Sequence, residues 1–263
     1  MLISFERAVL GRTGLEAGRL GLSASYKMPT AAVEQAVEAG MNYLYWGSLR
    51  RDAFAQAIRN LASRRERLVI VLQCYSPLSG WIEWNVERGL RALSLDHADA
   101  LLLGMWNRPV TPRVLDVGHK LKDRGLIRFL ALSTHNRPLA PKLADSEIDI
   151  FHVRYNAVHT GAERDVFPRL AVDARPGLVA FTATSWKQLL GHRRIPKNER
   201  VPTAGDCYRF VLTNPNLDVC MTGLGSVEHW RHAHAALRKG PMSEDEMAWM
   251  RRVGDAIYGK PRR

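Results

Sequence analysis

The stretch KDRGLIRFLALSTHN, residues 122–136, contains a helix end, a strand and a polar loop in immediate succession. Gly125 follows several charged residues and is well suited to ending a helix. Residues 127–133, IRFLALS, are short and mostly apolar, which indicates a strand. A strand that is apolar on both faces is typical of a parallel sheet covered by helices. This stretch therefore predicts one helix–strand unit of an alternating α/β fold.

The same unit repeats along the chain. Short apolar runs predict strands at 20–26, 41–46, 68–74, 99–104, 127–133, 148–154, 177–183 and 217–223. Helical segments are predicted at 30–40, 52–62, 81–93, 111–124, 138–144, 162–171, 204–213 and 226–238. A capping box at 243–246 predicts an extra C-terminal helix that runs to about Tyr258. Eight β/α units without a linker favour a closed (β/α)8 TIM barrel and a single domain over residues 1–263.

The bulk properties narrow the choice of partners. The formal charge of +12 permits an anionic ligand, but the arginine pairs are scattered and no recognition motif accompanies them, so nucleic acid is not expected. Cys74, Cys207 and Cys220 are far apart, which indicates reduced thiols. No apolar stretch approaches the length of a membrane span, and the N-terminus lacks a signal-peptide core. We therefore expect a cytoplasmic protein with no membrane partner.

In a barrel of this kind, ligands bind at the C-terminal ends of the strands. These ends carry few carboxylates and many aromatic, amide and cationic groups. The candidates for substrate binding are Trp46, Trp106, Asn107, Arg108, Arg154 and Tyr155. Tryptophans offer flat faces, and arginines pair bidentately with carboxylate or phosphate. The pattern predicts a small aromatic or anionic ligand at the barrel mouth.

Several motifs in the right order resemble the aldo-keto reductase family over essentially the whole chain. Residues 7–23 resemble its N-terminal β-hairpin and first strand, and EAGMNYLYWG at 38–47 resembles its second strand. SLDHADALLL at 94–103 is similar to its fourth strand, and residues 122–136 and FHVRYN at 151–156 are similar to the fifth and sixth. The resemblance implies a barrel with an N-terminal hairpin that reduces carbonyls with NADPH.

The residues that carry out catalysis in that family are replaced here. Its Asp, Tyr, Lys and His fall on Tyr45, Arg50, Gln73 and Gly104. The resemblance therefore implies a divergent member that lacks this tetrad and has a rebuilt active site. Tyr45, Arg50, Gln73 and His135 are the candidate catalytic residues. Without a neighbouring lysine, we expect the pKa of Tyr45 to stay near that of free tyrosine, about 10.

The resemblance also implies a cofactor site. The nicotinamide carboxamide would lie against Ser133, Asn136 and His152, the nicotinamide ring against Phe181, and the pyrophosphate beside Thr182 and Lys187. The family's clamp for a 2′-phosphate falls near Gly223, His229, His232 and Ala233, which do not form a strong one. NADP and NAD both stay open as the cofactor, with weak binding expected.

Three hypotheses about function follow. The first is an NAD(P)-dependent oxidoreductase of unusual mechanism, the second a non-redox enzyme or ligand-binding protein, and the third a catalytically silent partner protein, that is, a pseudoenzyme. His229 and His232 share a helical face without an acidic or cysteine ligand, so we expect surface histidines and no metal site. The sequence specifies neither the substrate nor the oligomeric state.

Overall fold

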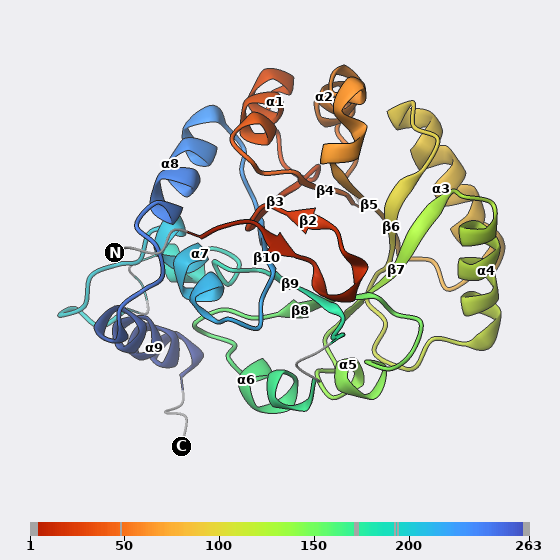
Figure 1. Cartoon of the computed structure of the whole chain (residues 1–263). Coiled ribbons are helices and arrows are strands. Elements are labelled where there is room, and N and C mark those ends of the chain that lie inside the picture. The colour runs from red at the N-terminus through yellow and green to blue at the C-terminus, as the bar shows by residue number, and fades with distance from the viewer. Residues whose placement is uncertain (1–4, 48, 171–173, 192, 194, 260–263) are drawn as a thin grey trace.

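The computed structural model describes residues 5–47, 49–170, 174–191, 193 and 195–259. Within these residues, eight parallel strands close into a barrel in the order β10-β3-β4-β5-β6-β7-β8-β9 (Figure 1). The strands are β3 Leu20–Ser23, β4 Tyr43–Trp46, β5 Val69–Cys74, β6 Ala98–Leu103, β7 Ile127–Thr134, β8 Ile150–Arg154, β9 Gly177–Phe181 and β10 Val219–Thr222. The predicted α/β TIM barrel is confirmed.

Helices surround this barrel (Figure 1). They are α1 Thr30–Glu38, α2 Asp52–Asn60, α3 Ser79–Leu93, α4 Pro112–Asp123, α5 Leu139–Lys142, α6 Ala162–Asp165, α7 Ala204–Thr213, α8 Val227–Leu237 and the extra C-terminal helix α9 Glu244–Tyr258. The prediction of a helix over 162–171 is wrong, because α6 ends at Asp165 and a 3-10 turn follows at Phe167–Arg169. Pro168 lacks an N–H and would clash with the carbonyl four residues before it. None of the described helices combines the length and the apolar content that crossing a bilayer requires.

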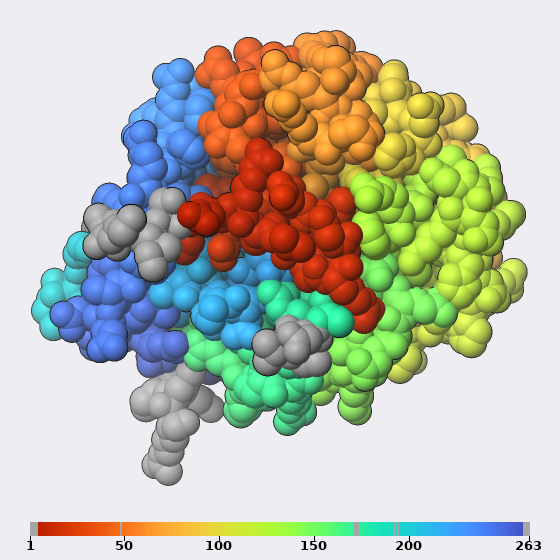
Figure 2. Space-filling view, viewed as in Figure 1, coloured from red at the N-terminus to blue at the C-terminus, as the bar shows by residue number. Residues whose placement is uncertain are grey.

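A two-stranded hairpin covers the N-terminal end of the barrel, as Figures 1 and 2 show in red. Its strands β1 Ala8–Val9 and β2 Glu16–Ala17 pair antiparallel, which confirms the predicted hairpin. The backbone N–H of Arg12 donates to the carbonyl of Arg175 at 2.8 Å. Gly11 has a φ of 49°, and a Cβ there would lie 2.3 Å from the backbone nitrogen of Gly177. Only glycine fits this contact.

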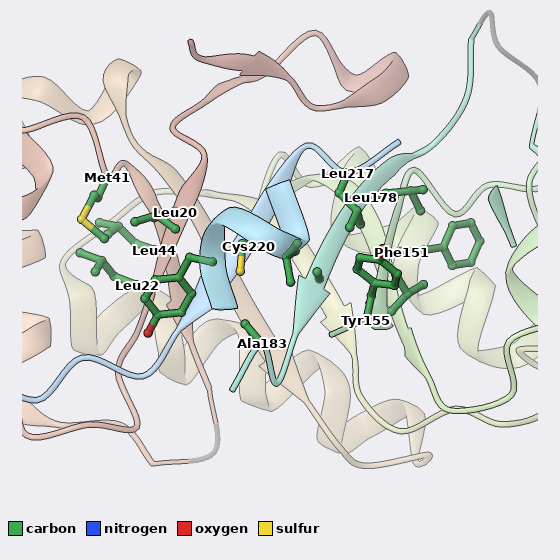
Figure 3. Packing of buried hydrophobic residues seen from close by; sticks show 14 of the residues in the cluster. Leu20, Leu22, Met41, Leu44, Phe151, Tyr155, Leu178, Ala183, Leu217 and Cys220 are labelled. Atoms are coloured by element: carbon green, nitrogen blue, oxygen red, sulfur yellow. The ribbon is translucent and has the colours of Figure 1, made fainter. Parts of the chain in front are cut away.

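Buried side chains form two layers, one inside the barrel and one between the barrel and the helices. Tyr43, Val69 and Val71 belong to the inner layer. Leu22, Leu44 and Tyr155 belong to the outer layer, part of which is drawn in Figure 3. Because successive residues of a strand point to opposite faces, this alternation decides which side chains can reach the barrel mouth.

Carboxylates at the beginnings of alternate strands tie the N-terminal end of the barrel together. Each accepts a hydrogen bond from a backbone N–H of the preceding strand and also pairs with an arginine. These bonds run from Ile70 to Asp99 at 2.8 Å, from Leu130 to Asp149 at 3.0 Å and from Leu178 to Asp218 at 2.8 Å. This end of the barrel therefore provides stability and leaves the opposite end for ligands.

Candidate functional site

The mouth of the barrel is formed by inward-facing side chains at the C-terminal ends of the strands. Because strand side chains alternate between the two faces, a residue two positions after an inner-layer residue also points inward. Inner-layer residues such as Tyr43, Val71 and Val179 therefore precede the inward side chains at the strand ends. We call this set the mouth: Tyr45, Gln73, Ser133, His152, Arg154 and Phe181. Strand register places Ser133 beside His152 and Arg154 beside Phe181. The structure thus brings together predicted residues of both the catalytic and the cofactor groups.

Tyr45 lies in the mouth against Tyr75, a residue that the sequence did not single out. Burial raises the pKa of Tyr45 well above its ordinary value, and interaction with the Tyr75 hydroxyl raises it further. Arg50 opposes this shift but contributes least among its causes. The expectation of an unshifted pKa is therefore wrong, because desolvation disfavours the phenolate.

Tyr75 and Gln73 fill the space next to Gly104. A Cβ at Gly104 would lie 2.5 Å from the Gln73 amide nitrogen and 2.6 Å from the Tyr75 ring. Gln73 is 3% exposed, and its Oε1 has no hydrogen-bond partner among the described residues. The sequence does offer one indication of Tyr75: it lies two residues after Gln73 and directly after the end of β5. A side chain at position 104 cannot coexist with this arrangement.

Arg50 ties the loop after β4 to its neighbours. Its Nη2 donates to the carbonyl of Gln73 at 2.9 Å and to Oδ1 of Asn85 at 2.8 Å, and its Nε donates to the carbonyl of Gly47 at 3.2 Å. The guanidinium also lies 6.0 Å from the ring centroid of Trp46. Burial lowers the pKa of Arg50. No carboxylate of the described residues pairs with it, but the hydrogen bonds above already hold the group in the wall.

Two predicted substrate-binding residues lie behind the barrel wall. Trp46 is 2% exposed and packs against Phe54 in the outer layer, with ring centroids 6.4 Å apart. The Tyr155 hydroxyl donates to Glu163 at 2.6 Å, and the ring stacks on Phe210 at 5.8 Å. Strand alternation turns both side chains away from the mouth, which corrects the prediction that they contact substrate.

Asn107 and Asn136 join the loops after β6 and β7. Oδ1 of Asn107 accepts from the backbone N–H groups of His135 at 2.9 Å and Asn136 at 3.2 Å. The Asn136 amide donates to the carbonyl of Asn107 at 3.1 Å. Trp106 is half-buried against the outer layer, and Arg108 is exposed. These contacts give the two asparagines a positioning role that the sequence analysis did not foresee.

His152 is held by Tyr43 inside the barrel. The Tyr43 hydroxyl and the His152 Nε2 are 2.7 Å apart, and His152 is 3% exposed. Burial lowers the pKa of His152 to about 3 and raises the pKa of Tyr43, so both groups are neutral near neutral pH. The buried Tyr43 hydroxyl has no other hydrogen-bond partner among the described residues, so its hydrogen is satisfied only if it donates to Nε2. We therefore assign the imidazole hydrogen to Nδ1.

Phe181 provides an aromatic face at the adjacent strand end. The edge of the His135 ring contacts it, with centroids 5.5 Å apart and planes at 84°. Burial, and then the charge of Arg154, lower the pKa of His135. Burial and the charge of Arg137 lower the pKa of Arg154 itself. This side of the mouth therefore combines an aromatic platform with a partly desolvated cation.

The loop after β9 carries backbone strain. Thr182, Ser185, Trp186 and Lys187 have φ values of 59°, 49°, 56° and 66°, in the left-handed region although none is glycine. Such residues cost roughly 1–2 kcal/mol each and cluster at binding sites. Ser185 is 1% exposed, and its hydroxyl has no partner among the described residues. The next residue, Trp186, is 73% exposed.

The segment after β10 lacks a fixed cation. Residues 223–230 contain no lysine or arginine. The Tyr26 ring occupies the space beside Gly223, where a Cβ would lie 2.6 Å from it. His229 is the third residue of α8, and its Nδ1 accepts from the Gly225 N–H at 3.3 Å. Among the described residues, no three His, Cys, Asp or Glu side chains are grouped as metal ligands.

Comparison with known proteins places this geometry in a family. The chain is similar in structure to aldo-keto reductase AKR11C1 from Bacillus halodurans, with a TM-score of 0.79 for the holo form at 17% identity and 0.77 for the apo form at 18%. Each match covers 96% of this chain and 97% of the other.

The thermostable aldo-keto reductase Tm1743, solved with the inhibitor epalrestat, has a TM-score of 0.72 at 22% identity, over 94% of this chain and 99% of that one. These identities are low, so the likeness shows the fold. A search of curated proteins found no match. The sequence model of the aldo/keto reductase family matches residues 9–185. The chain therefore belongs to the aldo/keto reductase family.

Proposed function

We propose that this protein binds a nicotinamide dinucleotide at the barrel mouth and does not reduce carbonyls by the tyrosine-based route of its family. One observation carries the proposal: Ser133, His152 and Phe181 lie on three adjacent strand ends and face the mouth. They supply a hydroxyl, an oriented N–H and an aromatic face, the groups that a carboxamide on a flat ring requires.

The residues present fit the nicotinamide end of such a cofactor. Tyr43 occupies Nε2 of His152, so Nδ1–H is left to donate to the carboxamide oxygen. The Ser133 hydroxyl, next to it in register, can accept from the amide nitrogen, and Phe181 can stack on the ring. When bound, a nicotinamide cofactor supplies a hydride.

The remainder of the cofactor would be held less firmly. The strained loop at 182–187 offers the Ser185 hydroxyl and the charge of Lys187 to a pyrophosphate. Residues 223–230 offer no cation to a 2′-phosphate. We therefore propose weak binding with little preference between NADP and NAD.

The mouth is short of a suitable proton donor. Tyr45 holds its proton more tightly than a free tyrosine, because burial raises its pKa. A general acid of raised pKa transfers a proton to a carbonyl poorly. Arg50 is hydrogen-bonded into the wall of the mouth, and a side chain at Gly104 would have to displace Gln73 and Tyr75. We infer that the family's tetrad is lost at Tyr45, Arg50, Gln73 and Gly104.

The second ligand is proposed to be a small aromatic or anionic molecule. Arg154 is half-buried in the mouth, and no carboxylate of the described residues pairs with it. A partly desolvated guanidinium favours carboxylate or phosphate in bidentate geometry. His135 and Phe181 add an aromatic wall beside it. We propose that substrate recognition rests on Arg154 and His135.

A non-redox or catalytically silent ligand-binding role is the second candidate. It is favoured by Tyr75, whose ring fills the space beside Gly104. For either function we propose one domain over residues 1–263 acting in the cytoplasm, where the buried Cys74, Cys207 and Cys220 would stay reduced.

We expect reduction of generic aldehydes and ketones to stay at background. The reason is the absence of a tuned acid at Tyr45, Arg50 and Gly104. The measurement is NADPH consumption at 340 nm with a panel of simple carbonyls. Turnover at rates ordinary for enzymes, about 1 per second or faster, would show that Tyr45 or another group serves as the acid and would contradict the proposal.

We expect Phe181→Ala to weaken nicotinamide cofactor binding by about 1 kcal/mol or more, the scale of a lost aromatic contact. Tryptophan quenching during titration with NADPH and NADH measures it, since Trp186 is exposed in the adjoining loop. Phe5→Ala is the matched control, because Phe5 packs against the outer layer and beside Arg19, before the hairpin; this variant should bind like the parent. Equal affinity in the parent and both variants, or no binding by the parent, would contradict the proposal that a nicotinamide cofactor binds against Phe181.

A further inference from the structure

Exposed hydrophobic side chains gather on one end of this molecule. Apart from Val9 and Tyr258, those of the described residues lie in loops that follow strands or in the first turns of α3. Those beside β4, β5 and β6, which are adjacent in the barrel, form a set that we call the apolar rim: Leu49, Tyr75, Leu78, Trp81, Trp84 and Met105, each 43–59% exposed.

Specific contacts hold side chains of the apolar rim in place. The Trp81 and Trp84 rings pack edge to face at 5.2 Å, and the Arg88 guanidinium lies 5.0 Å from the Trp84 ring centroid. Met105 is 59% exposed on a residue with a φ of 60°, a costly conformation for a non-glycine residue. Exposed apolar side chains grouped at one end of a molecule mark an interaction site.

Two exposed arginines without an ion pair to any described residue, Arg88 and Arg108, accompany the apolar rim. Glu83 and Glu87 of α3 both pair with Arg124, the residue directly after α4. Arg88 and Arg108 have no carboxylate partner among the described residues. Apolar and unneutralised cationic groups are thus combined on the rim.

We propose that the apolar rim docks on an anionic lipid surface. Tryptophan and tyrosine favour the bilayer interface, and each arginine near an anionic surface adds attraction. Docking of a second copy through the same rim would bring the Arg88 and Arg108 charges of two chains, each of charge +12, into one interface, and their repulsion opposes it.

This inference revises the expectation of no membrane partner. That expectation rested on the lack of a long apolar segment, whereas surface docking requires only exposed side chains. Since the rim follows the C-terminal ends of β4 to β6, docking turns the barrel mouth toward the lipid headgroups and the hairpin away from them. The cytoplasmic leaflet, which is anionic, is the matching surface.

Vesicle flotation tests the proposal, with phosphatidylcholine vesicles alone and with phosphatidylglycerol added. We expect the parent chain to float with the anionic vesicles and its tryptophans to be quenched by brominated lipid. Trp81→Ala combined with Trp84→Ala should lower the partition coefficient about tenfold or more, because two aromatic side chains leave the interface. Arg88→Gln should lower it about fivefold.

Two control variants distinguish docking through the apolar rim from a general effect of apolar surface or of charge. Val9→Ala removes apolar surface at the hairpin end, and Arg238→Gln removes one exposed charge at the end of α8; both should partition like the parent. Binding that is equal in the double tryptophan variant, or no binding to anionic vesicles, overturns the proposal. A dimer in sedimentation that the tryptophan changes dissociate would overturn it in favour of a second copy. Neither result bears on the cofactor, whose residues lie inside the mouth.

Discussion

We expect Asp99→Ala to lower the free energy of unfolding by about 3–5 kcal/mol. Asp99 is 1% exposed and accepts the backbone N–H of Ile70 at 2.8 Å. Its carboxylate also lies 2.9 Å from the guanidinium of Arg65 and 3.2 Å from that of Arg128. Truncation leaves a buried N–H without an acceptor and the Arg65 charge, whose side chain is 13% exposed, without its partner.

Urea unfolding measured by circular dichroism gives this value. Asp96→Ala is the matched control, because Asp96 is exposed in the loop just before β6 and forms no ion pair with described residues. Its effect should stay within about 0.5 kcal/mol. Similar losses in both variants would show that the strand-start carboxylates do not hold the barrel end together.

We expect the parent chain to lose stability on acidification more steeply than His152→Gln does. The difference should approach about 1.4 kcal/mol per pH unit below about pH 6. Burial lowers the pKa of His152 from 6.5 to about 3 in the folded chain. Between these values the unfolded chain binds a proton that the folded chain does not, so lowering the pH favours unfolding. Above the unfolded pKa, the two proteins should show the same pH dependence.

Unfolding curves at a series of pH values measure the difference. Glutamine keeps a polar group that can accept from the Tyr43 hydroxyl but does not titrate, so it isolates the imidazole. Parallel stability curves for the two proteins would mean that folding does not lower the pKa of His152. The Nδ1–H assignment, which depends on a buried neutral imidazole, would then lose its support, and so would the donor proposed for the carboxamide.

Local signals were enough to predict most of the fold. The strand predicted at 127–133 is observed at Ile127–Thr134, and the helix predicted at 204–213 is observed at Ala204–Thr213. Apolar periodicity and capping residues act over a few positions, so they can be recognised in a single sequence. The helix expected at 162–171 is too long, because Pro168 cannot continue an α-helix.

The site was harder to predict, because its geometry depends on contacts distant in sequence. Trp46 was assigned to the mouth, yet the alternation of β4 with Tyr43 and Tyr45 inside already turns Trp46 outward. That correction was available from the strand pattern. The bond from Tyr43 to His152 joins residues 109 positions apart, and the place of Tyr75 beside Gly104 depends on two loops. No local pattern indicates either contact.

Saturation-transfer NMR of NAD+ and NADP+ with the parent chain tests the central claim most directly, because it reports which end of the cofactor the protein holds. Phe181 and His152 should contact the nicotinamide ring, while residues 223–230 grip the adenosine weakly. We predict the strongest transfer to the nicotinamide protons of both cofactors, and its loss in Phe181→Ala. Strongest transfer to the adenine protons, or none to either end, would contradict the account.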